Sequence, residues 1–184
     1  MRPGRLLGLG IAVILVAAAC GSTDPVPDPI SLSPESFEAM ESEELSAEAT
    51  RGIVSGGIPD PDFNSDPATS GPYADRWAGC GNYRQAIPEI YLVHSLRRGS
   101  VVINYQPALE LAEVVGLEEL VVEIGGGVLA APKPGLDHPI VLSAWTKLLP
   151  LEEFDRSTIR AFVDQFGQSA PDNQVCPLEI DEAG

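Results

Sequence analysis

Apolar residues recur at the spacing of an α-helix near the end of the chain. Asp155 stands where an N-cap side chain accepts hydrogen bonds from free N–H groups, and Gly167 ends the pattern. Phe154, just before the cap, can pack on Ile159 as a hydrophobic staple. We therefore predict a helix between Asp155 and Gly167. Its apolar face consists of Ile159, Phe162, Val163 and Phe166.

A second helical pattern follows Pro107. Its apolar residues stand at i, i+3, i+4 and i+7, and residues 125–127 are three glycines that end it. A glycine run can cradle phosphate, but only where it precedes a helix N-terminus. Because these glycines follow a helix, a C-cap is the better interpretation. The apolar face comprises Leu117, Leu120, Val121 and Ile124.

Continuous apolar runs predict the strands. Residues 101–103 form the clearest core strand. Residues 90–96 and 100–105 are separated by Arg97-Arg98-Gly99, which predicts a hairpin or a turn into a buried strand. Residues 128–131 and 139–145 are short β-like runs joined by the turn at residues 132–135.

These elements together indicate an α+β fold in two layers, a small mixed β-sheet with two packed helices. Residues 51–177 have the length of one domain, and residues 178–184 are expected to be a disordered tail. Many Gly and Pro residues up to Tyr83 predict a long ordered loop with at most short elements. We expect residues 67–83 to wrap the sheet, with Trp77 in the core.

The N-terminus has the layout of a secretory signal. Arg2 and Arg5 precede an apolar run that is too short to span a bilayer. The segment Val-Ala-Ala-Ala-Cys-Gly at residues 16–21 resembles the bacterial lipobox, although Ala17 stands where Leu is commonest. The resemblance implies that residues 1–19 are removed and that Cys20 is lipidated. The alternative is a plain signal peptide followed by a chance cysteine.

Charge defines the segment that follows. Without residues 1–19 the chain keeps 9 basic and 27 acidic side chains, so a nucleic-acid partner is not expected. Residues 21–50 contain eight acids, four prolines and no Lys or Arg, which predicts a flexible tether over residues 20–50. Within it, Phe37, Met40 and Leu45 are also compatible with one short helix.

Two cysteines remain after Cys20. Exported proteins meet oxidising conditions, so Cys80 and Cys176 are expected to form one disulfide that closes a loop of 97 residues. A metal–thiolate or redox pair is the alternative, but the chain has no CxxC motif and the two cysteines are far apart in sequence. An anchored, oxidised domain would be extracytoplasmic and attached to the cell membrane.

Several rare motifs resemble an uncharacterised bacterial family of secreted or membrane-anchored proteins, a domain of unknown function. The family pattern runs PPTSGPH, W, GxY, VHSLEHG and PxVLTAWG, and the similarity covers about residues 65–166. No biochemical activity comes with this resemblance. The matching residues here are Ser70-Gly71-Pro72, Trp77, Cys80-Gly81, Tyr83, Val93-His94-Ser95-Leu96, Gly99, Val101-Val102-Ile103, Tyr105, Pro107, Ala131-Pro132 and 139–145.

The departures from the family pattern concern histidine. Tyr73 replaces the family's His, and Arg97 and Arg98 replace its Glu and His. Clustered histidines in an exported domain would suggest copper or zinc, but only His94 remains at a matching position. The competing interpretation is a partly buried histidine that hydrogen-bonds the loop at residues 67–83. A divergent metal-binding protein stays an alternative, and no cofactor is expected.

An enzyme has little support in the sequence. No HExxH, GxSxG or P-loop motif is present. His94 and Ser95 would point to opposite faces of a strand, which disfavours a base–nucleophile pair, although a hydrolase-like enzyme stays open. A binding or envelope-associated module fits better, because aromatic side chains could line a groove. The candidate ligand-binding residues are Tyr73, Trp77, Tyr83, His94 and Tyr105.

Overall fold

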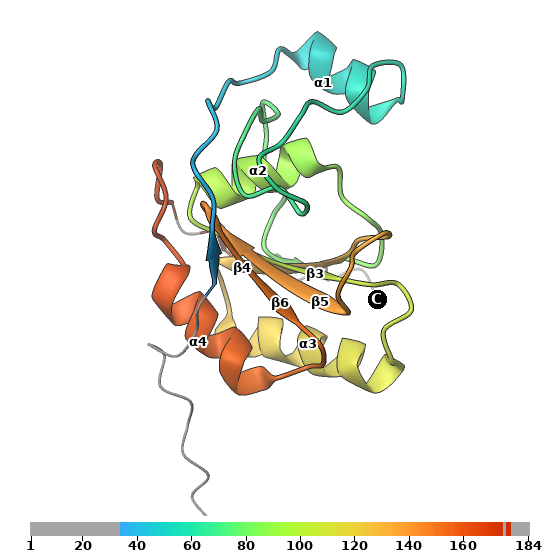
Figure 1. Ribbon diagram of the computed structural model, residues 1–184, viewed down its shortest axis with the longest axis vertical. Helices are drawn as coiled ribbons and strands as arrows, with labels where there is room; N and C mark the ends of the chain where they lie inside the picture. Colours follow the sequence, from blue (N-terminus) through green and yellow to red (C-terminus); the bar gives the residue numbers. More distant parts are fainter. Residues whose placement is uncertain (1–33, 175, 178–184) are drawn as a thin grey trace, which may run out of the picture.

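The computed structural model describes residues 34–174, 176 and 177, and its centre is one mixed β-sheet (Figure 1). The strand order is β1-β6-β5-β3-β4-β2. β3 pairs in parallel with β4, which pairs in parallel with β2, whereas the β3–β5, β5–β6 and β6–β1 pairs are antiparallel. The strands are β1 (Glu35–Ser36), β2 (Gly81–Asn82), β3 (Val101–Tyr105), β4 (Val128–Pro132), β5 (Ile140–Ala144) and β6 (Lys147–Leu151).

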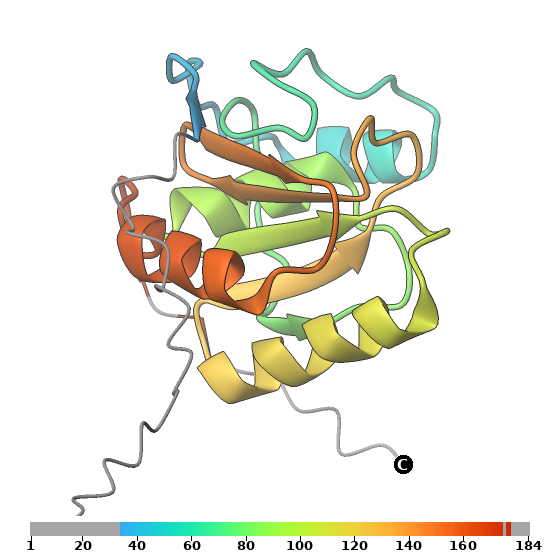
Figure 2. The same cartoon turned by 60° about the horizontal axis from the view of Figure 1, so that its bottom comes forward.

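Helices cover both faces of the sheet. The helices are α1 (Ala47–Val54), α2 (Glu89–Arg97), α3 (Leu111–Ile124) and α4 (Arg156–Phe166). α1 does not cover the sheet, because its Ile53 packs with Ala74 and Ile90. α3 and α4 pack on one face and bury Leu117, Leu120 and Phe162 against the central strands. α2 packs on the other face through Leu92 and Leu96 (Figures 1 and 2). The α+β class is confirmed, but the domain has helices on both sides of the sheet instead of two layers.

The best marked sequence patterns form the elements they predict. Asp155 caps α4 by accepting hydrogen bonds from the N–H groups of Ser157 and Thr158, and Gly167 is its C-cap. Gly125 ends α3 in the left-handed conformation with φ 87°. Residues 101–103 lie in the fully buried strand β3. Both predicted helices and the central strand are therefore confirmed.

The prediction of a strand over residues 90–96 is wrong. These residues belong to α2, in which six of nine residues are buried. A helix covered on nearly all sides has no polar stripe, so the 3.6-residue period is hidden and the run resembles a buried strand. Pro88 immediately before the helix and Glu89 in its first turn are the signals that could have identified it.

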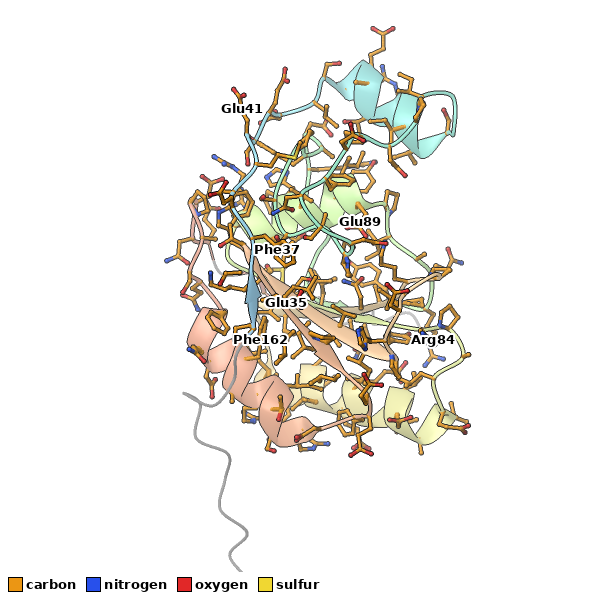
Figure 3. The ribbon with its side chains drawn as sticks, viewed as in Figure 1. Glu35, Phe37, Glu41, Arg84, Glu89 and Phe162 are labelled. Atoms are coloured by element: carbon orange, nitrogen blue, oxygen red, sulfur yellow. A yellow bond between two sulfur atoms is a disulfide. The ribbon has the colours of Figure 1, made fainter. Side chains whose placement is uncertain are left out.

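The N-terminal part of the described chain is an arm that packs on the domain. β1 pairs with β6, the N–H of Phe37 donates to the carbonyl of Thr146, and Phe37 packs beside Val141 and Leu148 (Figure 3). The flexible tether, and the short helix with which Phe37, Met40 and Leu45 were compatible, are therefore wrong for residues 34–46, and the first helix in the described residues is α1. The signal, Cys20 and the tail at residues 178–184 lie outside the described residues.

A C-terminal strap, which comprises residues 168–174, 176 and 177, lies beside the end of α2. The N–H groups of Asp172 and Gln174 donate to the carbonyls of Arg97 and Arg98. Cys176 forms a disulfide with Cys80, and their Cα atoms are 5.7 Å apart. The predicted disulfide is confirmed, and it joins the strap to the residue before β2.

Candidate functional site

Three of the predicted ligand-binding residues meet at the C-terminal end of α2. His94 comes from α2, whereas Tyr73 and Trp77 come from the loop at residues 67–83. The Tyr73 and His94 ring centroids are 4.9 Å apart, and those of Trp77 and His94 are 5.5 Å apart. Both contacts are edge-to-face, an arrangement that aromatic rings favour. The imidazole therefore lies between two aromatic rings.

His94 is buried, with 6% of its surface exposed. Its Nδ1 lies 2.7 Å from the carbonyl oxygen of Ala74. A carbonyl can only accept, so Nδ1 carries the proton and donates, and Nε2 is the acceptor in the neutral ring. Burial lowers the pKa of His94, and the positive charge of Arg98 lowers it further. The ring is thus neutral at pH 7, and the predicted hydrogen bond to the 67–83 loop is confirmed.

Two arginines extend this cluster at both ends. The Arg97 guanidinium lies 5.1 Å from the Tyr73 ring centroid, and that of Arg98 lies 3.6 Å from the Trp77 ring centroid. The order is therefore cation, ring, imidazole, ring, cation, which we call the cation–aromatic cluster. From the sequence, both arginines were assigned to a turn and noted as departures from the family motif, but they were given no place in a site. Their position one turn after His94 becomes visible only once α2 is recognised as a helix.

The strap binds both arginines. Asp172 forms an ion pair with Arg97 at 3.0 Å, and the Arg98 guanidinium donates to the side-chain oxygen of Gln174. Backbone hydrogen bonds at the same four residues reinforce these contacts. The disulfide at Cys176 keeps the strap beside the cluster.

Trp77 is not a core residue. Its side chain is 42% exposed, so the expected anchoring of the loop by a buried Trp77 is wrong. The loop is held instead by hydrogen bonds from α2, since Ser95 Oγ donates to the carbonyl of Ala78 at 2.8 Å and His94 binds Ala74. These contacts free the indole from a packing role and leave it at the surface.

The other two predicted ligand-binding residues, Tyr83 and Tyr105, do not form a single groove with this cluster. Tyr105 is buried among the residues that α3 and α4 cover, on the sheet face opposite α2. Its hydroxyl donates to the carbonyl of Tyr83, and burial raises the pKa of Tyr105. Tyr83 packs beside Leu92 on the α2 side, and its hydroxyl donates to the carbonyl of Gly79. Both therefore contribute to the packing of the domain.

The geometry does not assemble a base–nucleophile pair or a metal centre from these residues. Ser95 Oγ donates its single proton to the carbonyl of Ala78 at 2.8 Å and lies 3.1 Å from the carbonyl of Tyr91, and His94 Nδ1 donates to the carbonyl of Ala74. In residues 34–174, 176 and 177, no three His, Cys, Asp or Glu side chains are grouped so that they could hold a metal ion. His138 pairs with Glu152 at 2.7 Å, on the loop before β5.

A partly buried ion pair, between Lys133 and Glu89, supports the other end of the loop. Lys133 Nζ lies 2.6 Å from Glu89 and 3.0 Å from Asp66, and Glu89 also accepts from the N–H of Ala68. Burial raises the pKa of Glu89, which Lys133 opposes. Burial alone would lower the pKa of Lys133, but the attraction of Glu89 raises it overall. The sequence contained no signal for this pairing, because its members are far apart in the chain.

Fold and site define an α+β domain with a surface cation–aromatic cluster, stabilised by one disulfide. Residues 60–177 match the model of a family described as protein of unknown function (DUF3105), and the chain belongs to this family. The expected membership of an uncharacterised family is thereby confirmed. No curated protein and no solved structure matches the chain. None of the helices in the described part of the chain is long and apolar enough to cross a membrane.

Proposed function

We propose that this protein is a lipid-anchored, extracytoplasmic binding domain that holds its ligand at the cation–aromatic cluster. The observation that carries the proposal is the exposed indole of Trp77, stacked under Arg98 and ordered by His94. A large aromatic side chain at the surface is a common anchor for a ligand, because it offers wide contact area at little conformational cost. A catalytic role has no comparable support.

The chemistry of the cluster suggests the class of ligand. Asp172 already pairs with Arg97, but the Arg98 guanidinium donates to the uncharged Gln174 and keeps its positive charge for an anionic oxygen of a ligand such as a carboxylate. The indole offers an apolar face to a ring. The whole chain is strongly acidic, with a net charge of −16, so this cationic position contrasts with the rest of the molecule. The best fit is a small ligand that carries a carboxylate next to a flat or ring-shaped apolar part.

The anchored, exported state is supported by three features. The N-terminal 19 residues have the layout of a signal, and Cys20 occupies the lipobox position. The Cys80–Cys176 disulfide is the kind of bond that persists in oxidising compartments. Two or three acyl chains on Cys20 would give durable membrane attachment, since each buried CH2 contributes about 0.8 kcal/mol.

Binding is tested by tryptophan fluorescence with two sugars, N-acetylmuramic acid and N-acetylglucosamine, of which only the first carries a lactyl ether group with a carboxylate. We expect a saturable change with the acidic sugar and at least about tenfold weaker binding of the neutral one. Trp77→Ala should abolish the response, whereas Trp145→Phe, which changes the other tryptophan, should keep it. Equal binding of both sugars, or a response that survives Trp77→Ala, would contradict the proposed site.

Anchoring is tested separately by labelling cells with a radioactive fatty acid. We expect label on the wild-type protein and none on Cys20→Ala. Equal labelling of the two proteins would end the anchor proposal but leave the binding proposal in place.

A further inference from the structure

The strap places one side chain on each arginine of the cation–aromatic cluster, and these two side chains differ in charge. Asp172 meets Arg97 with both carboxylate oxygens, since Oδ2 lies 3.0 Å from Nε and Oδ1 lies 3.3 Å from a terminal guanidinium nitrogen. Such a forked, charge-assisted contact is among the strongest that a guanidinium makes. The guanidinium of Arg98 instead donates to the uncharged amide oxygen of Gln174. Arg98 is therefore the arginine whose partner is easier to replace.

The backbone of the strap is fixed where it passes these arginines. The N–H of Gln174 donates to the carbonyl of Arg98 at 2.7 Å, and the N–H of Gln168 donates to the carbonyl of Gly99 at 2.7 Å. A Cβ on Gly99 would lie only 2.8 Å from the Cα of Gln168, so the strap packs directly on this glycine. The disulfide of Cys176 holds the strap two residues after Gln174. A ligand can therefore displace the Gln174 side chain while the strap backbone stays in place.

The bond between Gln174 and Arg98 favours exchange with an anionic ligand. Gln174 is exposed, and a hydrogen bond at an exposed position contributes little net stability because water can replace either partner. A ligand carboxylate on the same guanidinium would form a charge-assisted bond, which is roughly twice as strong as a neutral one. A hydroxyl or carbonyl of a neutral ligand would only replace one uncharged acceptor by another. Exchange at Arg98 therefore selects a carboxylate over a neutral oxygen.

We propose that Gln174 is a specificity-determining residue of the ligand site: its amide oxygen occupies Arg98 until a ligand carboxylate takes its place. This inference rests on the proposed function, because it needs a ligand at the cation–aromatic cluster. Asp172 stays on Arg97 during the exchange, so the ligand meets one available guanidinium, that of Arg98 over the indole of Trp77. Competition between the ligand and the Gln174 side chain then sets the affinity of the site.

The test compares the dissociation constant of N-acetylmuramic acid for the full chain and for variants at position 174, measured by tryptophan fluorescence. Gln174→Ala removes the competing oxygen and should tighten binding at least about threefold. Gln174→Glu places a carboxylate on Arg98 in nearly the same volume and should weaken binding at least about tenfold. Because this carboxylate keeps the bond to Arg98, Gln174→Glu should melt no lower than the wild type.

Gln168→Glu is the matched control for the added charge. It makes the same substitution at another exposed position of the strap, whose backbone contacts Gly99 instead of an arginine. Because salt screens charges at the surface, it should change the dissociation constant less than about twofold. Equal weakening by Gln168→Glu and Gln174→Glu would overturn the inference, in favour of general charge repulsion.

The same titrations separate a failure of this inference from a failure of the proposed function. If the wild type binds the acidic sugar through Trp77 and both variants at position 174 bind it equally well, the proposed function stands and the role of Gln174 is refuted. If neither the wild type nor Gln174→Ala binds the sugar, the proposed function fails and this inference fails with it. Binding by Gln174→Ala alone would support the inference, because the glutamine would then be what keeps the sugar from Arg98.

Discussion

His94 shows how one residue can organise the candidate site. Its imidazole donates to the carbonyl of Ala74 and separates Tyr73 from Trp77. Because the ring is buried beside Arg98, protonation would place a second positive charge in a poorly solvated position, and the pKa of His94 is lowered. The residue acts as a neutral spacer that holds the loop and presents the indole.

This lowered pKa predicts a pH dependence of stability. The pKa of His94 in the unfolded chain is about 6.5, and in the folded chain it is lower. As pH falls through the unfolded-state pKa, the unfolded chain binds a proton that the folded chain does not yet bind, so the free energy of unfolding decreases. His94→Asn keeps a donor for Ala74 and removes the titrating group. We expect the variant to cost about 1 kcal/mol at neutral pH through lost ring contacts. Its stability should fall less steeply than that of the wild type between about pH 7 and pH 5, as measured by urea unfolding.

The control for this prediction is His138→Asn, which removes the other histidine, a half-exposed residue on a different loop. Its pH profile should follow the wild type more closely than that of His94→Asn. A His94→Asn profile that parallels the wild type over the whole range would show that His94 does not carry the dependence.

At the scale of elements, strong local sequence signals predicted the helices and strands correctly. Elements whose identity depends on their tertiary surroundings were not predicted. α3 and α4 carry one-sided apolar patterns with a glycine or an N-cap at their ends, so both could be recognised. β6 was not predicted from the sequence, and Pro150 within it is a residue that disfavours a strand. The structure accommodates it because β1 covers only residues 147 and 148 of β6, so the edge beside Pro150 needs no donor.

The same distinction explains the candidate site. Tyr73, Trp77 and His94 could be selected from motifs, and the structure brings them together. The two arginines and the strap could not be selected, because their contacts depend on α2 being a helix and on a chain segment more than seventy residues away. The type of side chain was enough to select candidate site residues from the sequence. Which residues surround them could be known only from the folded structure.

The left-handed C-cap of α3 gives a second prediction. Gly125 has φ 87°, and a Cβ there would meet no atom within 4 Å. Gly125→Ala should therefore cost about 1 to 2 kcal/mol from backbone conformation alone. Gly57→Ala is the control, because that Cβ would make only ordinary contacts. Chemical denaturation of both variants measures the difference, and equal stabilities would contradict the assigned cap.

The arm at residues 34–46 gives a third prediction, since a free tether would contribute nothing to stability. Phe37 packs beside Leu136, Val141 and Leu148. Phe37→Ala should therefore lower the free energy of unfolding by about 1 to 2 kcal/mol, less than for a fully buried ring. Met40→Ala, at an exposed position of the same arm, should change it less. An unchanged free energy of unfolding for Phe37→Ala would show that the arm does not pack.

At the scale of the whole molecule, the disulfide joins two distant parts of the chain. Cys80 precedes the edge strand, and Cys176 holds the strap beside Arg97 and Arg98. The proposed anchor at Cys20 limits how far the domain can lie from the membrane. If Cys20 is the anchor, the residues between it and residue 34 can reach at most about 50 Å when fully extended, so the domain would stay close to the membrane.

Removal of this disulfide gives the fourth prediction. The cysteines are 96 residues apart, and closing so long a loop restricts the unfolded chain. The double variant Cys80→Ser, Cys176→Ser should lose about 4 to 5 kcal/mol in the chain-entropy model. Guanidinium unfolding with and without reductant measures it. A reductant effect that persists in the double variant would show that another thiol is responsible.

The most direct test of the central claim is one intact-mass measurement. The protein is isolated from its own cells after free thiols have been trapped with an alkylating reagent. We predict a chain that begins at Cys20, carries the added mass of its acyl groups, and has taken up no reagent at Cys80 or Cys176. A full-length chain recovered from the cytosol with both of these cysteines alkylated would contradict the account of an anchored, oxidised binding domain.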